Sequence, residues 1–330
     1  MTTIDSKEMH DVVVVGGGAA GVGVAVALQH AGIDNFVVLE RHQIGASFAR
    51  WPAETRFITP SFPTNSFGMI DLNSVAIGVS PGFSLEVEHP TGQEYARHLR
   101  AIADFFDIPV QEEINVTQVN REGSDFRIDT STTSWYARHV IWAAGEFQYP
   151  HLNGFTGSEL CRHTSTIASY AELEGDDFII IGGYESGVDA AYHLSLYDKR
   201  VRLFDRRCPW QATSSDPSVA LSPFTLERMR EDWFAEFVEL YPYTPINAVK
   251  RAGAGYELDA GGSIPLQTEV PPLWAGGFQG SHKLIEHMFE IREDGFPLLN
   301  EHDESTLEPG LFLCGPSIRH DNHIFCFIYK

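Results

Sequence analysis

The sequence has few cysteines, and they do not form a pattern typical of a disulfide framework or a metal site. The four cysteines, Cys161, Cys208, Cys314 and Cys326, include no Cys-x-x-Cys pair. None has the spacing to a histidine that zinc sites use. We therefore expect no bound metal, and free buried thiols of the kind found in a reducing compartment.

The sequence also lacks a long apolar run. No stretch reaches the roughly 18 apolar residues that a transmembrane helix needs. The first ten residues are polar, include Asp5 and Glu8, and lack the basic-then-apolar order of a signal peptide. These features predict a cytoplasmic protein without a membrane partner.

Positive charge is scarce as well. Lys and Arg together number 23 against 45 Asp and Glu, which gives a formal net charge of −22. This balance argues against nucleic acid and anionic membranes as partners. A host with an acidic proteome would explain the charge equally well, and a locally positive site can still bind an anionic cofactor.

What the sequence does contain is a complete dinucleotide-binding pattern near its start. The pattern consists of a strand, a glycine turn, a helix and a second strand that ends in an acid. It runs through a strand at 11–15, the glycines Gly16, Gly18 and Gly21, a helix at 19–31, a strand at 36–39 and finally Glu40. Such a unit predicts two parallel strands joined by a crossover helix.

Each part of this pattern has a chemical reason. Gly16 permits the tight turn, Gly18 lets the backbone approach a pyrophosphate, and Gly21 lets the helix pack closely on the strand. The start of the helix, at Ala19 and Ala20, presents free N–H groups to phosphates. Glu40 is placed to accept hydrogen bonds from a ribose 2′-hydroxyl and would repel a 2′-phosphate, which favours FAD or NAD over NADP. The predicted site also includes Arg41.

A second copy of the pattern begins 166 residues after the first. It consists of a strand at 178–181, the turn Gly182-Gly183-Tyr184-Glu185-Ser186-Gly187, a helix at 188–197, a strand at 201–204 and then Asp205, Arg206 and Arg207. Tyr184 stands where the second glycine is expected, so its side chain must point away from the phosphates or the pyrophosphate must sit differently. The alternative is a nucleotide-type fold that has lost its ligand.

The residues after this second pattern carry opposing signals. Asp205 favours NAD, whereas Arg206 or Arg207 could pair with a 2′-phosphate. Two adjacent guanidinium groups can outweigh one carboxylate, so we favour NADPH over NADH; a solvated charge cluster is the alternative reading.

These patterns predict an α/β protein with two Rossmann-like FAD/NAD(P)-binding domains of three-layer ββα type, the second inserted in the first. The length of 330 residues suits two domains. We expect an FAD-binding domain at 1–154 plus 276–330 and an NAD(P)-binding domain at 155–275. Within the latter, residues 226–240 could form an amphipathic helix.

The chain resembles the flavin-containing monooxygenase-like branch of two-dinucleotide-domain flavoproteins, in particular bacterial monooxygenases of this type. The resemblance covers nearly the whole chain. It rests on the glycine motif at 16–21, on Ser47–Pro52, on Arg56–Phe62, on Ala144-Gly145 followed by Pro150, on Glu185-Ser186-Gly187 with Asp189, and on Leu313-Cys314-Gly315 through His320-Asp321-Asn322 to Ile328-Tyr329-Lys330.

The resemblance implies FAD in the first domain and NADPH in the inserted one. Carried over to this chain, Trp51, Phe57, Ser61 and Phe62 would border the isoalloxazine, and Val119 would meet the adenine through its backbone. Asp321 and Asn322 would sit by the ribityl chain or the flavin pyrimidine end. Ala144, Gly145 and Gly315 complete the implied cofactor-binding set.

The leading functional hypothesis is therefore an NAD(P)H-dependent FAD monooxygenase that uses molecular oxygen to oxidise a small nitrogen-, sulfur- or carbonyl-containing substrate. His163 is the candidate proton carrier. A thioredoxin-reductase-like NAD(P)H:acceptor reductase is the first alternative. It would lack a Cys-x-x-Cys pair, and Ala20 in the glycine loop argues against disulfide chemistry.

A non-catalytic flavin-binding interaction protein is the second alternative, motivated by Tyr184. A homodimer is compatible with the sequence under any of these readings.

Overall fold

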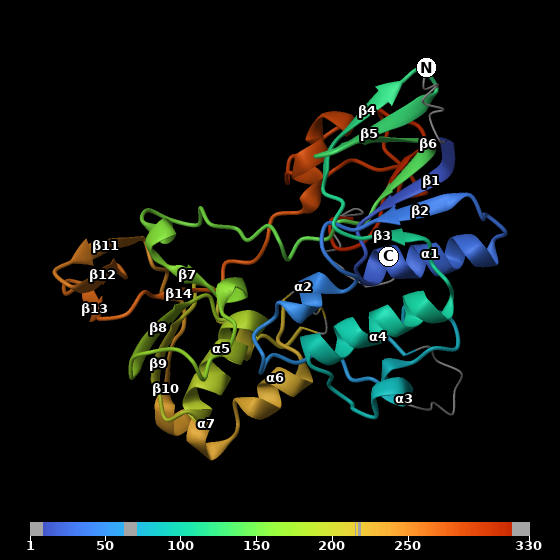
Figure 1. Cartoon of the computed structure of the whole chain (residues 1–330). Coiled ribbons are helices and arrows are strands. Elements are labelled where there is room, and N and C mark those ends of the chain that lie inside the picture. Colours follow the sequence, from blue (N-terminus) through green and yellow to red (C-terminus); the bar gives the residue numbers. More distant parts are fainter. Residues whose placement is uncertain (1–8, 63–70, 215, 217–218, 319–330) are drawn as a thin grey trace. The chain divides into compact units, whose positions relative to one another are not determined.

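The computed structural model describes residues 9–62, 71–214, 216 and 219–318. The chain divides into two compact units, labelled by their elements in Figure 1. The first unit comprises Met1–Ala49, Pro60–Tyr149 and Gln279–Lys330, and the second comprises Arg50–Thr59 and Pro150–Phe278. The second unit thus takes in the short segment Arg50–Thr59, which the sequence assigns to the first domain.

The first unit is built on a sheet whose strands run, in the described residues, in the order β3-β2-β1-β6-β5-β4, with β15 also paired to β6. Strands β1, β2, β3, β6 and β15 pair in parallel, whereas β4, β5 and β6 form an antiparallel meander. The strands are β1 (Met9–Val15), β2 (Phe36–Leu39), β3 (Val110–Gln111), β4 (Val116–Glu122), β5 (Asp125–Thr130), β6 (Ser134–Trp142) and β15 (Leu311–Leu313).

Alternating side chains of β1 divide this unit into layers. Val13 and Val15 join a buried cluster with the meander and with the 3₁₀ segment η4 (Ser281–Met288). Val14 faces the other way, toward helix α1 (Ala19–His30). In Figure 1, helix α4 (Gly92–Phe105) lies on the same side as α1. Short helices α2 (Ala46–Ala49) and α3 (Pro81–Leu85) complete the unit.

The second unit repeats this layering. Its parallel sheet has the order β10-β9-β8-β14-β7 within the described residues, and a separate antiparallel sheet has the order β11-β12-β13. The elements are β7 (Arg162–His163), β8 (Asp177–Ile181), α5 (Glu185–Leu196), β9 (Arg200–Phe204), α6 (Pro223–Arg228), α7 (Asp232–Phe237), β10 (Val238–Tyr241), β11 (Ala248–Ala252), β12 (Gly255–Asp259), β13 (Leu266–Thr268) and β14 (Leu273–Trp274).

The two faces of β8 show how these layers pack. Ile180 is buried in the cluster that contains the α5 residues Val188 and Leu194. Ile179 is buried in the opposite cluster with Leu258 of the small antiparallel sheet. Helices, parallel sheet and antiparallel sheet therefore form three layers in each unit, and the predicted α/β fold with two Rossmann-like ββα domains is confirmed.

The expected helix at 226–240 is wrong. The segment instead forms the end of α6, then α7, then strand β10. Val238 pairs in parallel with Val201 of β9, and this pairing continues to Tyr241. Pairing with the sheet edge and burial of Val238 outweigh the helical spacing of the apolar residues.

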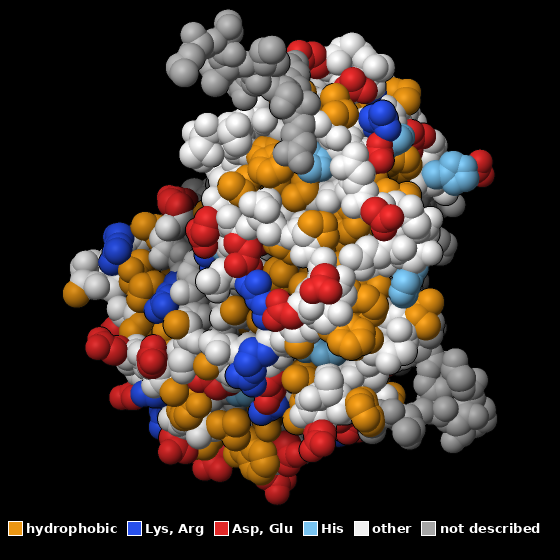
Figure 2. All heavy atoms as spheres, turned by 45° about the vertical axis from the view of Figure 1, so that its right-hand side comes forward, with side chains coloured by type: hydrophobic (Ala, Val, Ile, Leu, Met, Phe, Trp, Pro, Cys, Tyr) orange, Lys and Arg blue, Asp and Glu red, His pale blue; other side chains and the backbone are white. Residues whose placement is uncertain are grey.

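Acidic side chains are scattered over the face drawn in Figure 2 rather than gathered in one patch. This distribution fits the excess of 45 acidic over 23 basic residues in the sequence. No helix in the described part of the chain has the length and hydropathy needed to cross a bilayer.

His98 gives the first unit a testable dependence on pH. It is buried on α4, and its Nδ1 lies 2.7 Å from Ser84 Oγ. Burial lowers the pKa of His98 to about 4, although Asp71 acts in the opposite direction. As pH falls from the ordinary value of 6.5 to about 4, the unfolded chain gains a proton that the folded chain does not. The contribution of the neutral His98 ring to the free energy of unfolding is therefore fully present above pH 6.5 and is lost as the pH falls to about 4.

We expect the free energy of unfolding to fall over this pH interval, and to fall less in His98→Asn, which removes the titrating ring. Urea unfolding at a series of pH values between about 7 and 4 measures the difference. The same slope in both proteins would contradict the assignment to His98.

Candidate dinucleotide-binding sites

The first glycine loop joins β1 to α1 and is fixed by backbone hydrogen bonds. Gly16 N donates to Leu39 O at 2.8 Å, and Ala143 N donates to Val15 O at 2.8 Å. The loop therefore lies at the carboxyl ends of the parallel strands β1, β2 and β6, where open α/β sheets bind ligands.

The three motif glycines have different reasons to be glycine. A Cβ on Gly16 would lie 2.5 Å from Ala143 O, and φ is +110° there. A Cβ on Gly21 would lie 1.8 Å from Gly16 O. Gly18, in contrast, has no atom within 4 Å of the place where its Cβ would stand. Packing of the chain requires the first and third glycines, while the second leaves an open space at the amino end of α1, as a bound pyrophosphate needs.

Glu40 is buried beside this space. Its Oε2 accepts a 2.6 Å hydrogen bond from Gly17 N, and its Oε1 accepts a 2.8 Å bond from His42 N. Each carboxylate oxygen can accept a further bond, for example from a ribose hydroxyl. Next to it, Arg41 donates to Gln148 Oε1 and lies over the ring of Tyr149, 5.8 Å from its centroid.

Other predicted residues of the first unit gather at the same loop. A Cβ on Gly16 would also lie 2.9 Å from Ala144 Cα, and one on Gly315 would lie 3.4 Å from the Cβ of Ala20. Gly145 follows Ala144 with φ +67°, and its carbonyl accepts a bond from Ser281 N. The structure thus brings Ala20, Ala144 and Gly315 to the first glycine loop.

The second glycine loop forms hydrogen bonds equivalent to those of the first. Gly182 N donates to Phe204 O at 2.8 Å, and Gly183 N donates to Asp205 Oδ2 at 2.7 Å. A Cβ on Gly182 would lie 2.6 Å from Ala275 O, and a Cβ on Gly187 would lie 1.8 Å from Gly182 O. Helix α5 begins directly after Tyr184, as α1 begins after Gly18.

Tyr184 adopts the backbone conformation of its counterpart in the first loop. Its φ and ψ are −85° and −168°, against −81° and −167° for Gly18. Both lie in the extended region that any residue can adopt, so the tyrosine causes no backbone strain. Its hydroxyl donates to Ala220 O at 3.3 Å. The exposed Ser186 is the second residue of α5, where a backbone N–H has no intrahelical partner.

The second unit contains a cavity of about 790 Å³ at this loop. The volume falls in the range of small-molecule pockets. Among its lining residues are Gly182, Tyr184, Asp205, Arg206 and Arg207. The cavity therefore meets both the glycine turn and the charged residues that follow β9.

Asp205 organises the turn that carries the two arginines. Its Oδ1 accepts bonds from Arg207 N at 2.6 Å and from Cys208 N at 2.9 Å, while Oδ2 is bound to Gly183 N. Both arginines are exposed. Within the described residues, neither guanidinium has a carboxylate partner. The carboxylate is thus turned toward the backbone, and the guanidinium groups are left available to an anion.

The aromatic residues expected near the flavin fall in different units. Trp51 and Phe57 belong to the second unit, where their rings lie 5.0 Å apart. Ser61 and Phe62 belong to the first. Ser61 is buried and accepts a 2.7 Å bond from Asn73 Nδ2, whereas Phe62 is exposed.

Val119 lies on β4, in the buried cluster that also contains Leu39, the residue before Glu40. The Val119 carbonyl accepts a bond from His287 Nε2, and its backbone pairs with Ile128. The neighbour of Glu40 is Gln111, whose carbonyl accepts a 2.9 Å bond from Glu40 N. Sequence reasoning missed this position because β3 spans only two residues and shows no periodicity.

His163 has partners on both ring nitrogens. Nδ1 lies 2.8 Å from Ser165 Oγ and accepts a 3.2 Å bond from Ser165 N, while Nε2 donates to Gly277 O at 3.0 Å. Burial lowers the pKa of His163, opposed by the bond to Gly277. A neutral ring bound on both sides favours a structural role. The remaining predicted residues, Asp321 and Asn322, lie outside the described residues.

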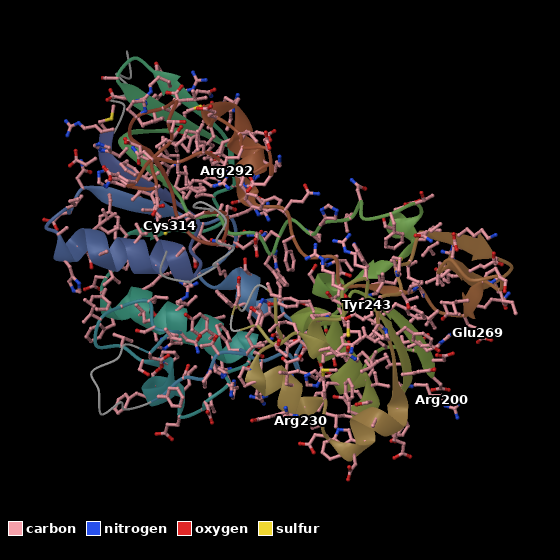
Figure 3. The ribbon with its side chains drawn as sticks, turned by 180° about the vertical axis from the view of Figure 1, so that it is seen from behind. Arg200, Arg230, Tyr243, Glu269, Arg292 and Cys314 are labelled. Carbon is pink, nitrogen blue, oxygen red and sulfur yellow. The ribbon has the colours of Figure 1, made fainter. Side chains whose placement is uncertain are left out.

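The cysteines of the described residues are poorly suited to thiolate chemistry. Burial raises the pKa of Cys161 and of Cys314 to about 12 and also raises that of Cys208. Figure 3 labels Cys314, which follows β15 in the first unit, and Tyr243, which follows β10 in the second. Reactive cysteines have lowered pKa values, the opposite of these three.

Two glycine loops of this geometry define a chain built to hold two dinucleotides. The family model for pyridine nucleotide-disulphide oxidoreductase matches residues 13–315, and the chain belongs to this family. Membership implies FAD and NAD(P)H as cofactors, and the open space at Gly18, the free acceptor capacity of Glu40 and the cavity of the second unit fit them.

Individual relatives are distant. Bacilliredoxin reductase Bdr of Bacillus subtilis (strain 168) is 24% identical over 313 residues, covering 92% of this chain and 88% of the relative. Uncharacterized oxidoreductase CzcO of Bacillus velezensis is 24% identical over 196 residues, covering 57% of this chain and 52% of the relative. The chain thus spans about half the length of the first curated relatives it matches.

Solved structures show the same fold. Bacillithiol disulfide reductase Bdr (YpdA) from Staphylococcus aureus has a TM-score of 0.78 at 17% identity, covering 98% of this chain and 94% of that one. A flavin-containing monooxygenase from Stenotrophomonas maltophilia has a TM-score of 0.72 at 18% identity, covering 93% and 90%. The resemblance to flavin monooxygenases is consistent with these findings, but the fold alone does not separate them from the reductases.

Proposed function

We propose that this chain is an NADPH-dependent FAD monooxygenase for a small nitrogen-, sulfur- or carbonyl-containing substrate, with molecular oxygen as the second substrate. The observation that carries the proposal is the first glycine loop, where Ala20 provides no thiol. A disulfide reductase needs a thiolate that faces the flavin. Cys314, at the end of β15, holds its proton too tightly, since burial raises its pKa to about 12.

The roles of the residues follow from their positions. When bound, FAD supplies the redox chemistry. Glu40 would hold the adenosine ribose, and the N–H groups of Ala19 and Ala20 would bind the pyrophosphate at the positive end of α1. The cavity of the second unit would take the nicotinamide dinucleotide at Gly182 and Gly183, with its phosphates at the amino end of α5.

NADPH is the proposed donor because Asp205 and the two arginines have different orientations. Asp205 accepts three backbone N–H bonds, one more than Glu40 accepts, so its carboxylate has less capacity left for a ribose hydroxyl. Arg206 and Arg207 line the cavity. A guanidinium group suits a phosphate because it can donate two parallel hydrogen bonds to it.

The test begins with anaerobic mixing of the flavin-loaded protein with NADPH, followed by flavin absorbance. We expect the flavin to be bleached, and bleached faster than with NADH. On addition of oxygen and a small thioether or amine, we expect oxygenated product in proportion to the NADPH consumed. Peroxide release without product would contradict monooxygenation, and absence of bleaching with either nucleotide would contradict any NAD(P)H oxidoreductase.

A reductase is the second candidate, favoured by the likeness to bacilliredoxin reductase Bdr over 92% of this chain. It predicts NADPH-dependent reduction of a disulfide or quinone under anaerobic conditions, at a rate above that of oxygen consumption. Parallel assays with bacillithiol disulfide and with a quinone separate the two candidates.

A further inference from the structure

The second glycine motif differs from the first at three consecutive positions, Tyr184, Glu185 and Ser186, and the first two carry much larger side chains than their counterparts. Tyr184 and Glu185 stand where the first loop has Gly18 and Ala19. Since the backbone conformations at Tyr184 and Gly18 match within a few degrees, the chain path does not require either departure. The reason for the larger side chains must lie in what they contact.

Both side chains bind one short stretch, Val219–Thr225, which we call the wall segment. The Tyr184 hydroxyl donates to Ala220 O at 3.3 Å. Glu185 Oε1 accepts a 2.5 Å bond from Ser222 N. Glu185 Oε2 accepts bonds from Ser222 Oγ at 3.3 Å and from Thr225 Oγ1 at 2.5 Å. Two consecutive residues therefore hold the same segment through four hydrogen bonds.

These bonds lie in a largely buried region. Ala220, Leu221 and Thr225 are buried, and the ring of Tyr184 packs against the cluster that contains Leu221. Burial raises the pKa of Glu185, opposed by the bonds from Thr225 and Ser222. A buried carboxylate is costly unless its oxygens are hydrogen-bonded, and the three bonds that Glu185 accepts offset this cost.

The wall segment also borders the cavity. Val219 and Tyr184 both line it, together with Gly182 and Arg206. Ser222 caps the amino end of α6 by accepting a bond from Thr225 N, so the capped turn and the wall segment are anchored together. The segment therefore forms a side of the cavity at the amino end of α5.

We propose that Tyr184 and Glu185 are positioning residues that hold the wall segment at the amino end of α5 and thereby retain the diphosphate-bearing part of the nicotinamide dinucleotide. The proposal rests on the proposed function only in that the second unit binds NADP(H). On this proposal, Tyr184 and Glu185 have a structural role and are not signs that the motif has lost its ligand.

The two explanations predict opposite results for one variant. Tyr184→Gly with Glu185→Ala copies the glycine, alanine order of the first loop. If the motif has decayed, this double variant restores the fingerprint and tightens binding of NADP⁺. If the two residues retain the wall segment, the variant releases it, and we expect the Kd for NADP⁺ to rise about tenfold or more, given four lost hydrogen bonds.

The experiment uses the flavin-loaded protein and oxidised NADP⁺, so no turnover is needed. Calorimetry gives the Kd, and hydrogen–deuterium exchange followed by mass spectrometry monitors peptides that cover 219–229 and, for comparison, strand β8. We expect faster exchange in 219–229 of the double variant and unchanged exchange in β8. Tyr184→Phe keeps the ring and should give a smaller rise in Kd.

Tyr197→Phe is the matched control. Its hydroxyl also lies at α5 but donates to Glu54, and the residue does not line the cavity. Unchanged or tighter NADP⁺ binding in the double variant, or unchanged exchange in 219–229, would overturn the proposal. Failure of the unaltered protein to bind NADP⁺ would instead overturn the proposed function.

Discussion

Gly21→Ala is expected to lower the free energy of unfolding of the first unit by about 3 kcal/mol and to release FAD. The new Cβ would lie 1.8 Å from Gly16 O, a backbone atom that cannot move aside without shifting the turn. Because Gly16 is itself packed against Ala143, the strain would pass into the end of β6. Urea unfolding and the flavin absorbance of the purified protein measure the two effects.

Gly18→Ala is the matched control. Its backbone conformation suits alanine, and no atom lies within 4 Å of the added Cβ, so stability should change by less than about 0.5 kcal/mol. FAD should nevertheless bind more weakly, since the methyl group would occupy space that the pyrophosphate needs. A Gly21→Ala protein as stable as its parent would contradict the described contact between α1 and the turn.

Replacing both Arg206 and Arg207 with alanine is expected to lower kcat/KM for NADPH about 100-fold and to change kcat/KM for NADH less than about threefold. Each charge-assisted hydrogen bond to a phosphate contributes about 1.5–3 kcal/mol, and each 1.4 kcal/mol corresponds to a factor of ten. Only NADPH carries the 2′-phosphate that these groups would bind. Steady-state kinetics with both nucleotides give the ratio.

Arg200→Ala controls for the loss of positive charge from an already acidic protein. Arg200 begins β9, whereas Arg206 and Arg207 follow its other end, and it does not line the cavity. It is one of the residues labelled in Figure 3. We expect no change in nucleotide preference. Retention of the NADPH preference by the Arg206, Arg207 double variant would mean that another group binds the phosphate.

The sequence predicts those parts of the site whose residues lie close together along the chain. Gly16, Gly18, Gly21 and Glu40 lie within one βαβ unit, so their spacing alone predicts the loop, the helix start and the acid beside it. The second loop, at Gly182, follows for the same reason. The structure shows both loops with matching hydrogen bonds, from Gly17 N to Glu40 and from Gly183 N to Asp205.

The parts that the sequence does not predict depend on contacts between distant residues. The segment Arg50–Thr59 joins the second unit through side chains such as Thr55, whose hydroxyl donates to Asp189 at 2.6 Å. The placement of Gln111 beside Glu40 depends on a two-residue strand pairing with β2. Neither contact leaves a periodic pattern, because each involves one or two residues meeting a partner far along the chain.

The matching backbone of Gly18 and Tyr184 bears on how dinucleotide motifs are recognised in other sequences. The first and third glycines are constrained by the chain, since any side chain there would overlap a carbonyl in both loops. The middle position has negative φ in both loops and tolerates a large residue. A pattern search that requires glycine at all three positions would discard such loops, whereas one that holds only the outer two would retain them and leave the ligand to be decided by experiment.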